Sequence, residues 1–322
     1  MKLGVLTVPL YDRDTEKAFE FLSSIGVEQV EIGTGGSPGK VHSQPEELLA
    51  SESKLNAYKD LLKKYNLEVS AFSCHSNHVH PDPAIRAEAE KDFSNTLRLA
   101  EKMDVHTVVS FSGCPGGSPT DKMPNWVTCS WPTDYQEVLK YQWEEVLIPF
   151  WQGAAKEAAN HGVNQIALEL HPGFCVYNVA TLLRLREAVG PAIGANFDPS
   201  HLFWQGVNPA EAIKALKGAI YHFHAKDTKI DQRNTSINGV LDTGSYGDLS
   251  DRSWLFRTSG WGHDQEVWKE MITALKMVGY DGVISIEHED AFMSIEEGLT
   301  KGVEFLKEVI IKESPANSWW LD

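Results

Sequence analysis

Four short stretches of this sequence each join an apolar run to acidic or histidine residues. They read IALELHPG, NFDPSHLFW, YHFHAKDT and ISIEHED, and they supply Glu169, Asp198, His224 and Glu287. Carboxylates that are buried close together repel one another unless a cation compensates their charge. Three carboxylates and one imidazole around one point are typical of a divalent-metal site. Because most of these ligands are oxygens, the set favours one Mn²⁺ ion, with Mg²⁺ or Co²⁺ as alternatives, over the thiolate-rich sites of structural zinc.

The two-residue repeat of a strand decides which neighbours of these residues face the same way. In HFHAKD, His224 and Lys226 share a face, so Lys226 is expected nearer the mouth of any site that His224 lines. In ISIEHED, Glu287 and Glu289 share a face, whereas His288 points toward the covering helices. Lys226 is therefore a candidate for substrate binding.

Each of these residues also has an ordinary structural explanation. Asp198 in DPSH could end a strand and cap the following helix. Capping does not explain why four successive strands end in an acid or a histidine. Further histidines lie near strand ends: His171 follows Glu169 by two residues, and HSNHVH supplies His75 and His78 after the third strand. We expect His171 to serve as an additional base, and His75 and His78 to contact substrate.

The elements that would position these residues alternate along the whole chain. Eight apolar, β-branched runs predict strands at 3–9, 28–33, 68–74, 106–113, 165–171, 193–198, 220–227 and 282–289. The segments between them have the three- and four-residue apolar spacing of helices, as in 15–26 and 45–66. Strands that alternate with helices predict an α/β fold with a parallel sheet, and eight such units favour a closed (β/α)₈ TIM barrel. No G-x-G-x-x-G follows a strand, which argues against a dinucleotide-binding sheet.

We expect one barrel domain over residues 1–322, with a C-terminal tail at 313–322. Two connections are much longer than usual: one runs from about residue 114 to 136 after strand four, the other from about 228 to 262 after strand seven. Both follow strands, so both would lie on the C-terminal face of the barrel, where this fold builds its active sites.

Aromatic and basic residues in the two insertions are further candidates for substrate contact. Trp126 lies in the first insertion, and Arg257, Trp261 and His263 lie in the second. Tryptophan rings offer a flat apolar surface on which a sugar ring or another flat ligand can stack. The alternative is that these aromatic residues fasten the loops to the barrel.

The composition limits the class of partner. The 322 residues carry 45 acids against 29 bases, a formal net charge of −16, which argues against binding to a phosphate backbone. Four cysteines without a C-x-x-C pair are expected to be free thiols in a reducing compartment. The apolar run at the N-terminus is too short for a signal peptide, and no stretch reaches the roughly 18 apolar residues of a membrane span. We therefore expect a cytoplasmic protein that binds neither nucleic acid nor membrane.

The four motifs that carry the acids and histidines resemble the strand ends of the xylose isomerase-like TIM-barrel superfamily. The resemblance covers essentially the whole chain and is strongest from the fifth strand to the eighth. It implies a metal held by Glu169, Asp198, His224 and Glu287. It also implies that Glu169 and Glu287 act as the acid/base pair, as in the sugar epimerases of this superfamily.

The resemblance extends to substrate-binding residues, with some departures. His201 resembles the substrate-contacting histidine that follows the metal aspartate, and Arg257 is the candidate for the substrate-clamping arginine. The long insertions and the added histidines His75, His78 and His171 depart from the simple epimerases. In these respects the chain is similar to the catalytic subunits of enzymes that cleave 3-oxo-glycosides by β-elimination.

These observations predict a metal-dependent sugar isomerase or epimerase that abstracts a proton next to a carbonyl and passes through an enediolate. The alternative is a lyase that eliminates an aglycone or water from a 3-oxo-sugar or 3-oxo-glycoside. The acidic net charge disfavours a DNA-repair endonuclease, and the intact glutamate pair disfavours a non-catalytic sugar-binding barrel. The expected partners are a small sugar or keto-glycoside and further copies of the chain in a homo-oligomer, with a small partner subunit if the lyase prediction holds.

Overall fold

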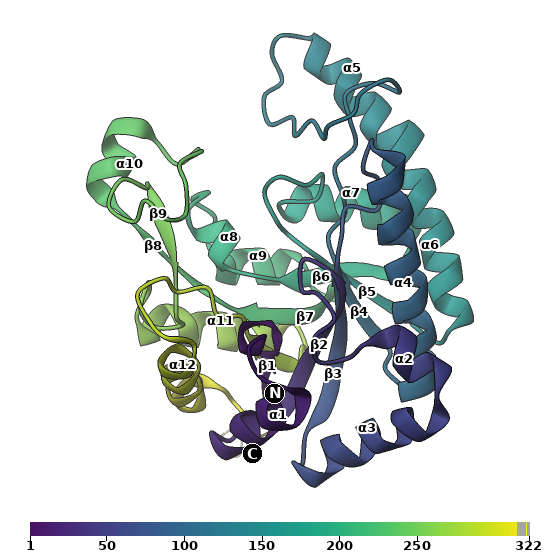
Figure 1. The fold of residues 1–322 in the computed structure, drawn as a ribbon. Coiled ribbons are helices and arrows are strands. Elements are labelled where there is room, and N and C mark those ends of the chain that lie inside the picture. Colours follow the sequence, from purple (N-terminus) through teal and green to yellow (C-terminus); the bar gives the residue numbers. More distant parts are fainter. Residues whose placement is uncertain (314–319, 321–322) are drawn as a thin grey trace.

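Eight parallel strands close into a barrel at the centre of the computed structural model, which describes residues 1–313 and 320 (Figure 1). The strands are β1 (Lys2–Leu6), β2 (Gln29–Gly36), β3 (Glu68–His75), β4 (Thr107–Ser110), β5 (Gln165–Glu169), β6 (Ile193–Phe197), β7 (Ile220–Ala225) and β10 (Val283–Ile286). Each strand pairs with its neighbours in chain order, and the ring closes through β1, which pairs with both β2 and β10. The predicted (β/α)₈ TIM barrel is confirmed.

Helices form the outer layer around the barrel. They are α1 (Thr15–Ser24), α2 (Pro45–Ala50), α3 (Glu52–Lys64), α4 (Pro83–Met103), α6 (Ile148–Asn160), α7 (Val179–Val189), α8 (Ser200–Phe203), α9 (Pro209–Ala215), α11 (Gln265–Met277) and α12 (Ile295–Val309). The single helix predicted over 45–66 is divided in two. Ser51 has an extended backbone and its side chain accepts a hydrogen bond from Lys54 N, so it ends α2 and caps the start of α3.

The strands are buried on both faces, as expected for a parallel barrel covered by helices. All five residues of β6 and all four of β10 are buried. Large side chains fill the space between barrel and helices, and Trp143, Trp151 and Trp268 are among the largest fully buried ones. The close packing also requires a glycine in β6, because a Cβ atom on Gly194 would lie 2.3 Å from the ring of Tyr221.

Both long insertions are confirmed. After β4, residues 111–133 contain no helix or strand before α5 (Asp134–Lys140) and the π-helical segment η2 (Tyr141–Leu147). After β7, the antiparallel strands β8 (Asp227–Ile230) and β9 (Trp254–Arg257) flank α10 (Gln232–Asn238). In Figure 1, α5 and α10 both project beyond the ring of helices.

The N-terminus is held by two residues of the C-terminal part of the chain, one just before β10 and one just after α12. The amino group of Met1 donates hydrogen bonds to Asp281 Oδ1 at 2.7 Å and to Ile311 O at 3.3 Å. Most of the predicted tail at 313–322 lies outside the described residues. The four cysteines all lie in the described part and are free thiols, as predicted. Among the helices described, none is both long and apolar enough to cross a membrane.

Candidate functional site

The four predicted metal ligands converge at the C-terminal end of the barrel. Glu169 is the last residue of β5, His224 lies one residue before the end of β7, and Asp198 and Glu287 directly follow β6 and β10. One ligand atom from each residue lies within 4.8 Å of the ligand atoms of the other three. Three of the side chains are at most 2% exposed, whereas Glu287 is 16% exposed. Three carboxylates held this close together in the protein interior favour a bound cation.

Two buried ligand atoms in this group have no hydrogen-bond partner. Asp198 accepts from Ser200 N through Oδ1 at 2.8 Å, which leaves Oδ2 free. His224 uses Nε2 to bond Glu31 Oε2 at 2.8 Å, which leaves Nδ1 free at 3.0 Å from Glu287 Oε2. Buried polar atoms without a partner are rare in proteins. A carboxylate oxygen and an imidazole nitrogen that converge in this way fit a divalent ion.

The charges around His224 also favour a cation at this point. Burial alone would lower the pKa of His224, but the nearby carboxylates of Glu31 and Glu287 outweigh burial and raise its pKa well above the ordinary value. Burial raises the pKa of Asp198 to about 7. The positive charge of Lys226 lowers this pKa, but it only partly offsets burial and the negative charge of Glu169. The carboxylates of the cluster therefore favour positive charge at His224.

Glu31 forms a second layer behind the ligands. It lies in β2, is fully buried, and accepts hydrogen bonds from His224 Nε2, from Ser285 Oγ at 2.9 Å and from Ser73 Oγ. Burial opposes its ionisation, but the charge of His224 and that of His222 outweigh burial and lower the pKa of Glu31 to about 2. A carboxylate bonded to one imidazole nitrogen fixes the ring and leaves the other nitrogen for a metal.

Glu169 is held by three donors. Its Oε2 accepts from His75 Nε2 at 2.9 Å and from Asn196 Nδ2 at 3.2 Å, and its Oε1 accepts from His201 Nε2 at 3.1 Å. Despite burial, these hydrogen bonds and charges lower the pKa of Glu169 well below its ordinary value. His201 also lies 3.3 Å from Asp198 Oδ2, and burial lowers its pKa to about 3, so it is a neutral donor between two proposed ligands.

A cavity of about 410 Å³ opens onto this cluster. Its polar lining consists of Ser37, His75, Glu169, His171, Lys226, Glu287 and Glu289. Its apolar lining consists of Leu6, Val8, Pro38, Phe111 and Phe174. The rings of Phe111 and Phe174 stack with their centres 4.2 Å apart. The cavity therefore combines a charged side, where the ligands lie, with an apolar side.

His171 presents a basic nitrogen beside Glu169. Its Nδ1 lies 2.5 Å from the carbonyl oxygen of Pro172, and a carbonyl can only accept, so Nδ1 carries the proton and Nε2 carries the lone pair. Burial lowers the pKa of His171, and the charge of Lys226 lowers it further against the opposing effect of Glu169. Its ring lies 4.0 Å from that of His201, centre to centre. A neutral imidazole at this position suits a general base.

Two of the predicted substrate contacts lie away from the cavity. His78 is fully buried behind the barrel wall, where Nε2 bonds Ser110 Oγ at 2.9 Å and the ring stacks on Phe150 with centres 5.6 Å apart. Trp126 packs edge-on against Tyr177 and lines a separate cavity of about 250 Å³ beneath the first insertion. The structure thus corrects both predictions, because packing against the outer layer has taken these rings out of reach of the ligands.

The candidates in the second insertion make structural contacts. Arg257 Nε donates to Asp290 Oδ2 at 2.9 Å, and His263 Nδ1 lies 2.7 Å from Asp227 Oδ1. Trp261 is 47% exposed, and it is not among the residues that line the cavity, nor are Arg257 and His263. The prediction that these three residues contact substrate is not supported by their positions, since none of them lines the cavity and ion pairs hold Arg257 and His263.

Some residues around the site carried no recognised signal in the sequence. Phe111 directly follows β4 and Phe174 lies in the loop after β5, so their positions beside strand ends were the available clue. Phe256 in β9 packs with its ring centre 4.6 Å from Lys226 Nζ and 5.3 Å from the ring of His201. The second insertion therefore reaches the side chains beside the proposed ligands through Phe256.

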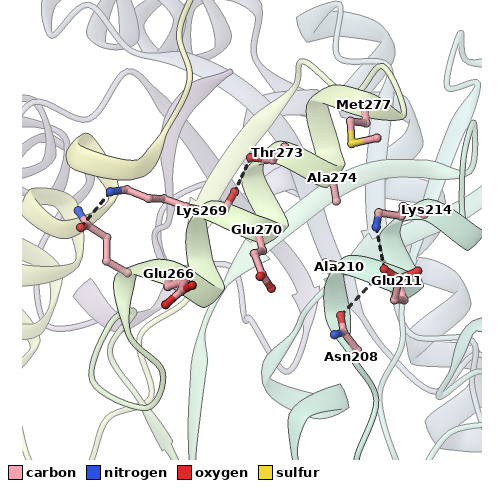
Figure 2. A pocket seen from close by; sticks show the side chains of 11 residues that line it. Asn208, Ala210, Glu211, Lys214, Glu266, Lys269, Glu270, Thr273, Ala274 and Met277 are labelled. Carbon is pink, nitrogen blue, oxygen red and sulfur yellow. Dashed lines mark hydrogen bonds and ion pairs between the residues drawn. The ribbon is translucent and has the colours of Figure 1, made fainter.

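A larger hollow of about 680 Å³ lies on the outside of the barrel, between α9 and α11 (Figure 2). Its two lysines are engaged locally, since Lys214 Nζ donates to Glu211 at 2.7 Å and Lys269 Nζ donates to Gln265 at 3.1 Å. It holds none of the groups that converge at the barrel mouth. The smaller cavity at the barrel mouth is therefore the better candidate for the active site.

Comparison with known proteins agrees with this architecture. The family model described as xylose isomerase-like TIM barrel matches residues 19–309. The uncharacterized protein YfiH of Bacillus subtilis (strain 168) is 40% identical over 313 residues, which cover 96% of this chain and 99% of YfiH.

Solved structures share the fold at much lower identity. The probable 3-DHS dehydratase AsbF of Bacillus anthracis has a TM-score of 0.66 and 17% identity, covering 95% of this chain and 99% of AsbF. The IolI protein, solved with a zinc atom, has a TM-score of 0.67 and 19% identity, covering 98% and 100%. D-psicose 3-epimerase of Clostridium cellulolyticum H10, solved with D-tagatose, has a TM-score of 0.61 and 16% identity, covering 96% and 99%. Together with the family match, which spans nearly the whole barrel, these comparisons place the chain in the xylose isomerase-like TIM-barrel family.

Proposed function

We propose that this protein is a divalent-metal-dependent sugar isomerase or epimerase that moves a proton next to a carbonyl group. The observation that carries the proposal is the convergence of Glu169, Asp198, His224 and Glu287 beneath a cavity. In this group Asp198 Oδ2 and His224 Nδ1 form no hydrogen bond and have only ion-pair contacts, such as those to Lys226 and Glu287 respectively. The fold shared with a ketose epimerase and with a zinc-containing protein supports it. We propose Mn²⁺ as the ion, because three of the four ligands are carboxylates.

The chain's own residues supply the proton transfer. A divalent ion bound here would act as a Lewis acid that stabilises the negative charge developing on the substrate carbonyl oxygen. One of the two glutamates, Glu169 or Glu287, takes the proton from the carbon next to the carbonyl. The other glutamate, protonated beforehand, returns a proton to the opposite face of the same carbon, which gives epimerisation. In isomerisation the proton goes instead to the former carbonyl carbon, while the proton of the neighbouring hydroxyl group moves to the former carbonyl oxygen.

Neighbouring side chains hold these groups in position. His75, Asn196 and His201 fix the Glu169 carboxylate through three hydrogen bonds of 2.9–3.2 Å. Lys226 lines the cavity, where its ammonium can donate to a substrate hydroxyl group, and the stacked rings of Phe111 and Phe174 form an apolar wall on one side. Fixed hydrogen-bond partners of this kind reduce the reorganisation needed when charge moves during the reaction.

The apolar side of the cavity favours a second candidate function, a lyase that acts on a 3-oxo-glycoside. Phe111, Phe174 and the aliphatic residues beside them offer no hydrogen bond to a sugar hydroxyl, but they suit an apolar aglycone. In that reaction Glu169 or Glu287 takes the α-proton, and a double bond forms between the α- and β-carbons as the bond between the β-carbon and its oxygen breaks. His171, which first takes a proton from solvent, gives that proton to the departing oxygen and so acts here as the general acid. We would then expect a small partner subunit beside the barrel.

The two reactions are separated by incubating the Mn²⁺-loaded protein in D₂O with a panel of ketoses and 3-oxo-glycosides. The isomerase or epimerase should place solvent deuterium on the carbon that receives the returned proton, which NMR detects, whereas the lyase releases an aglycone. Chelation should abolish turnover, and added Mn²⁺ should restore it. Glu169→Gln and Glu287→Gln should each lower the rate by about 10²–10⁴-fold.

The matched control is Glu270→Gln, which makes the same chemical change at the exposed hollow between α9 and α11. It should leave the rate unchanged. Undiminished turnover after complete chelation would overturn the metal-dependent proposal, and so would undiminished rates in both glutamate variants of the cluster.

A further inference from the structure

Lys226 is a charged side chain buried among the proposed metal ligands. Its side chain is 2% exposed, yet Nζ lies 2.7 Å from Glu287 Oε2, 3.0 Å from Glu289 Oε2 and 3.1 Å from Asp198 Oδ2. The ring of Phe256 covers the ammonium from the second insertion, with its centre 4.6 Å away. An ammonium group is stable in the protein interior only when it is paired, so these three carboxylates hold Lys226 where it is.

Two of the three oxygens that Lys226 contacts are the oxygens proposed to bind the metal. Asp198 Oδ2 is the atom that the hydrogen bond from Ser200 leaves free, and Glu287 Oε2 faces His224 Nδ1 at 3.0 Å. An ammonium and a divalent ion held against the same two oxygens would be like charges a few ångströms apart. Because like charges repel strongly in a buried site, the two cations compete for these atoms.

We propose that Lys226 is the resident counter-ion of the ligand cluster, and that its ammonium gives up this position when a divalent ion binds. The inference rests on the proposed metal-dependent function. Glu289 provides the destination, because its carboxylate already contacts Nζ at 3.0 Å and does not belong to the four-ligand group. Its side chain is 48% exposed, and it lines the cavity together with Lys226.

The exchange has two consequences for the site. Before the ion binds, Lys226 offsets the mutual repulsion of Asp198 and Glu287 and so keeps the ligands close together. After the ion binds, the ammonium lies nearer Glu289 and the cavity, where it can donate to a substrate oxygen. Metal loading and the assembly of the substrate-binding residues are thereby coupled, since each requires the same movement of one side chain.

The test is calorimetric titration of Mn²⁺ into chelator-treated protein, comparing wild type with Lys226→Met. Methionine keeps nearly the length of lysine but removes the competing charge. We expect Mn²⁺ to bind the variant more tightly, by about tenfold or more, a typical size for the coupling between two ligands of one protein. Without metal, Lys226→Met should melt at a lower temperature than metal-free wild type, and saturating Mn²⁺ should narrow this gap.

Lys229→Met is the matched control, because it makes the same change in net charge at an exposed position of β8. It should leave the affinity for Mn²⁺ unchanged. Glu289→Gln removes the proposed destination, so it should weaken Mn²⁺ binding when Lys226 is present and have no further effect in the Lys226→Met background. Lys226→Gln replaces Lys226→Met in both comparisons if the methionine variant does not fold.

Two results would overturn the exchange. One is an affinity of Lys226→Met for Mn²⁺ that equals or falls below that of wild type. The other is an equal loss of affinity from Glu289→Gln in both backgrounds. Wild-type protein that binds no divalent ion would refute the proposed metal-dependent function itself, and with it this inference, and the wild-type titration alone would reveal that failure.

Discussion

Glu31→Gln tests whether the residue behind the ligands controls metal binding. Glu31 Oε2 accepts from His224 Nε2 at 2.8 Å and from Ser285 Oγ at 2.9 Å, and Ser73 Oγ donates to Oε1. Glutamine has one acceptor oxygen and one amide donor in place of two acceptors, so it cannot satisfy all three donors. The imidazole of His224 then loses its fixed orientation, and the negative charge that makes Nδ1 more basic is removed.

The size of the effect follows from the role of such a partner. Loss of a hydrogen-bonded carboxylate behind a ligating histidine lowers metal affinity by about 10–100-fold, which corresponds to about 1.4–2.8 kcal/mol. Titration of Mn²⁺ into the chelated variant measures this directly. Glu31→Gln and Lys226→Met should therefore shift the affinity in opposite directions, although both change a buried charge near the same ion.

Ser285→Ala is the control for packing around Glu31, because it removes one donor and keeps the carboxylate. Its effect on Mn²⁺ affinity should be several-fold smaller than that of Glu31→Gln. Thermal unfolding with and without metal checks that both variants are folded. A folded Glu31→Gln variant that binds Mn²⁺ as tightly as wild type would refute the reasoning, since His224 would then be oriented by other contacts.

Two further predictions concern residues that support the site from behind. Burial lowers the pKa of His78 from 6.5 to about 4, so its contribution to stability is complete above pH 6.5 and is lost as the pH falls toward 4. At pH 5 this one group lowers the free energy of unfolding by about 2 kcal/mol. Urea unfolding at pH 7 and pH 5 should therefore show a larger loss of stability in wild type than in His78→Gln. Equal losses in the two proteins would contradict a neutral His78. Asp227 accepts from the backbone N–H groups of Gly260, Gly262 and His263, and from Trp268 Nε1, so Asp227→Ala should lower the free energy of unfolding by about 3 kcal/mol or more. Asp231→Ala removes the exposed N-terminal cap of α10 and should lower the free energy of unfolding by only about 1 kcal/mol in the same urea assay. Similar losses in the two variants would show that Asp227 is not the main anchor of the insertion.

The barrel and the convergence of the four proposed ligands were predictable because they depend on local patterns. Each strand reveals itself by an apolar run, and the closed parallel arrangement brings all the C-terminal strand ends to one side. Glu169, Asp198, His224 and Glu287 therefore converge as soon as the strand boundaries are right to within a residue or two. Closure of the barrel brings distant strand ends together, so it is enough that each acid or histidine lies at the end of its strand.

The remaining contacts could not be read from the sequence, because they join segments far apart in the chain. Glu31 and His224 are separated by 193 positions, and nothing near Glu31 indicates that its partner is an imidazole. Glu31 was missed, whereas His78 was wrongly predicted to contact substrate. His78 follows a strand as the site residues do, but its ring turns outward to stack on Phe150. In a loop without a regular repeat, the direction of a side chain depends on tertiary packing rather than on its position in the sequence.

The joint between β7 and the second insertion has a consequence for how such enzymes can diversify. β8 begins at Asp227, two residues after β7 ends at Ala225, and the polar contacts of Asp227 clamp both ends of the hairpin to the barrel. Between these clamped ends, residues 231–253 form no part of the ligand cluster. The hairpin is thus anchored to the barrel at both ends. Its tip can vary in length and composition while His224 and Lys226 keep their positions. Changes in residues 231–253, none of which lines the cavity, should therefore leave the ligand cluster undisturbed.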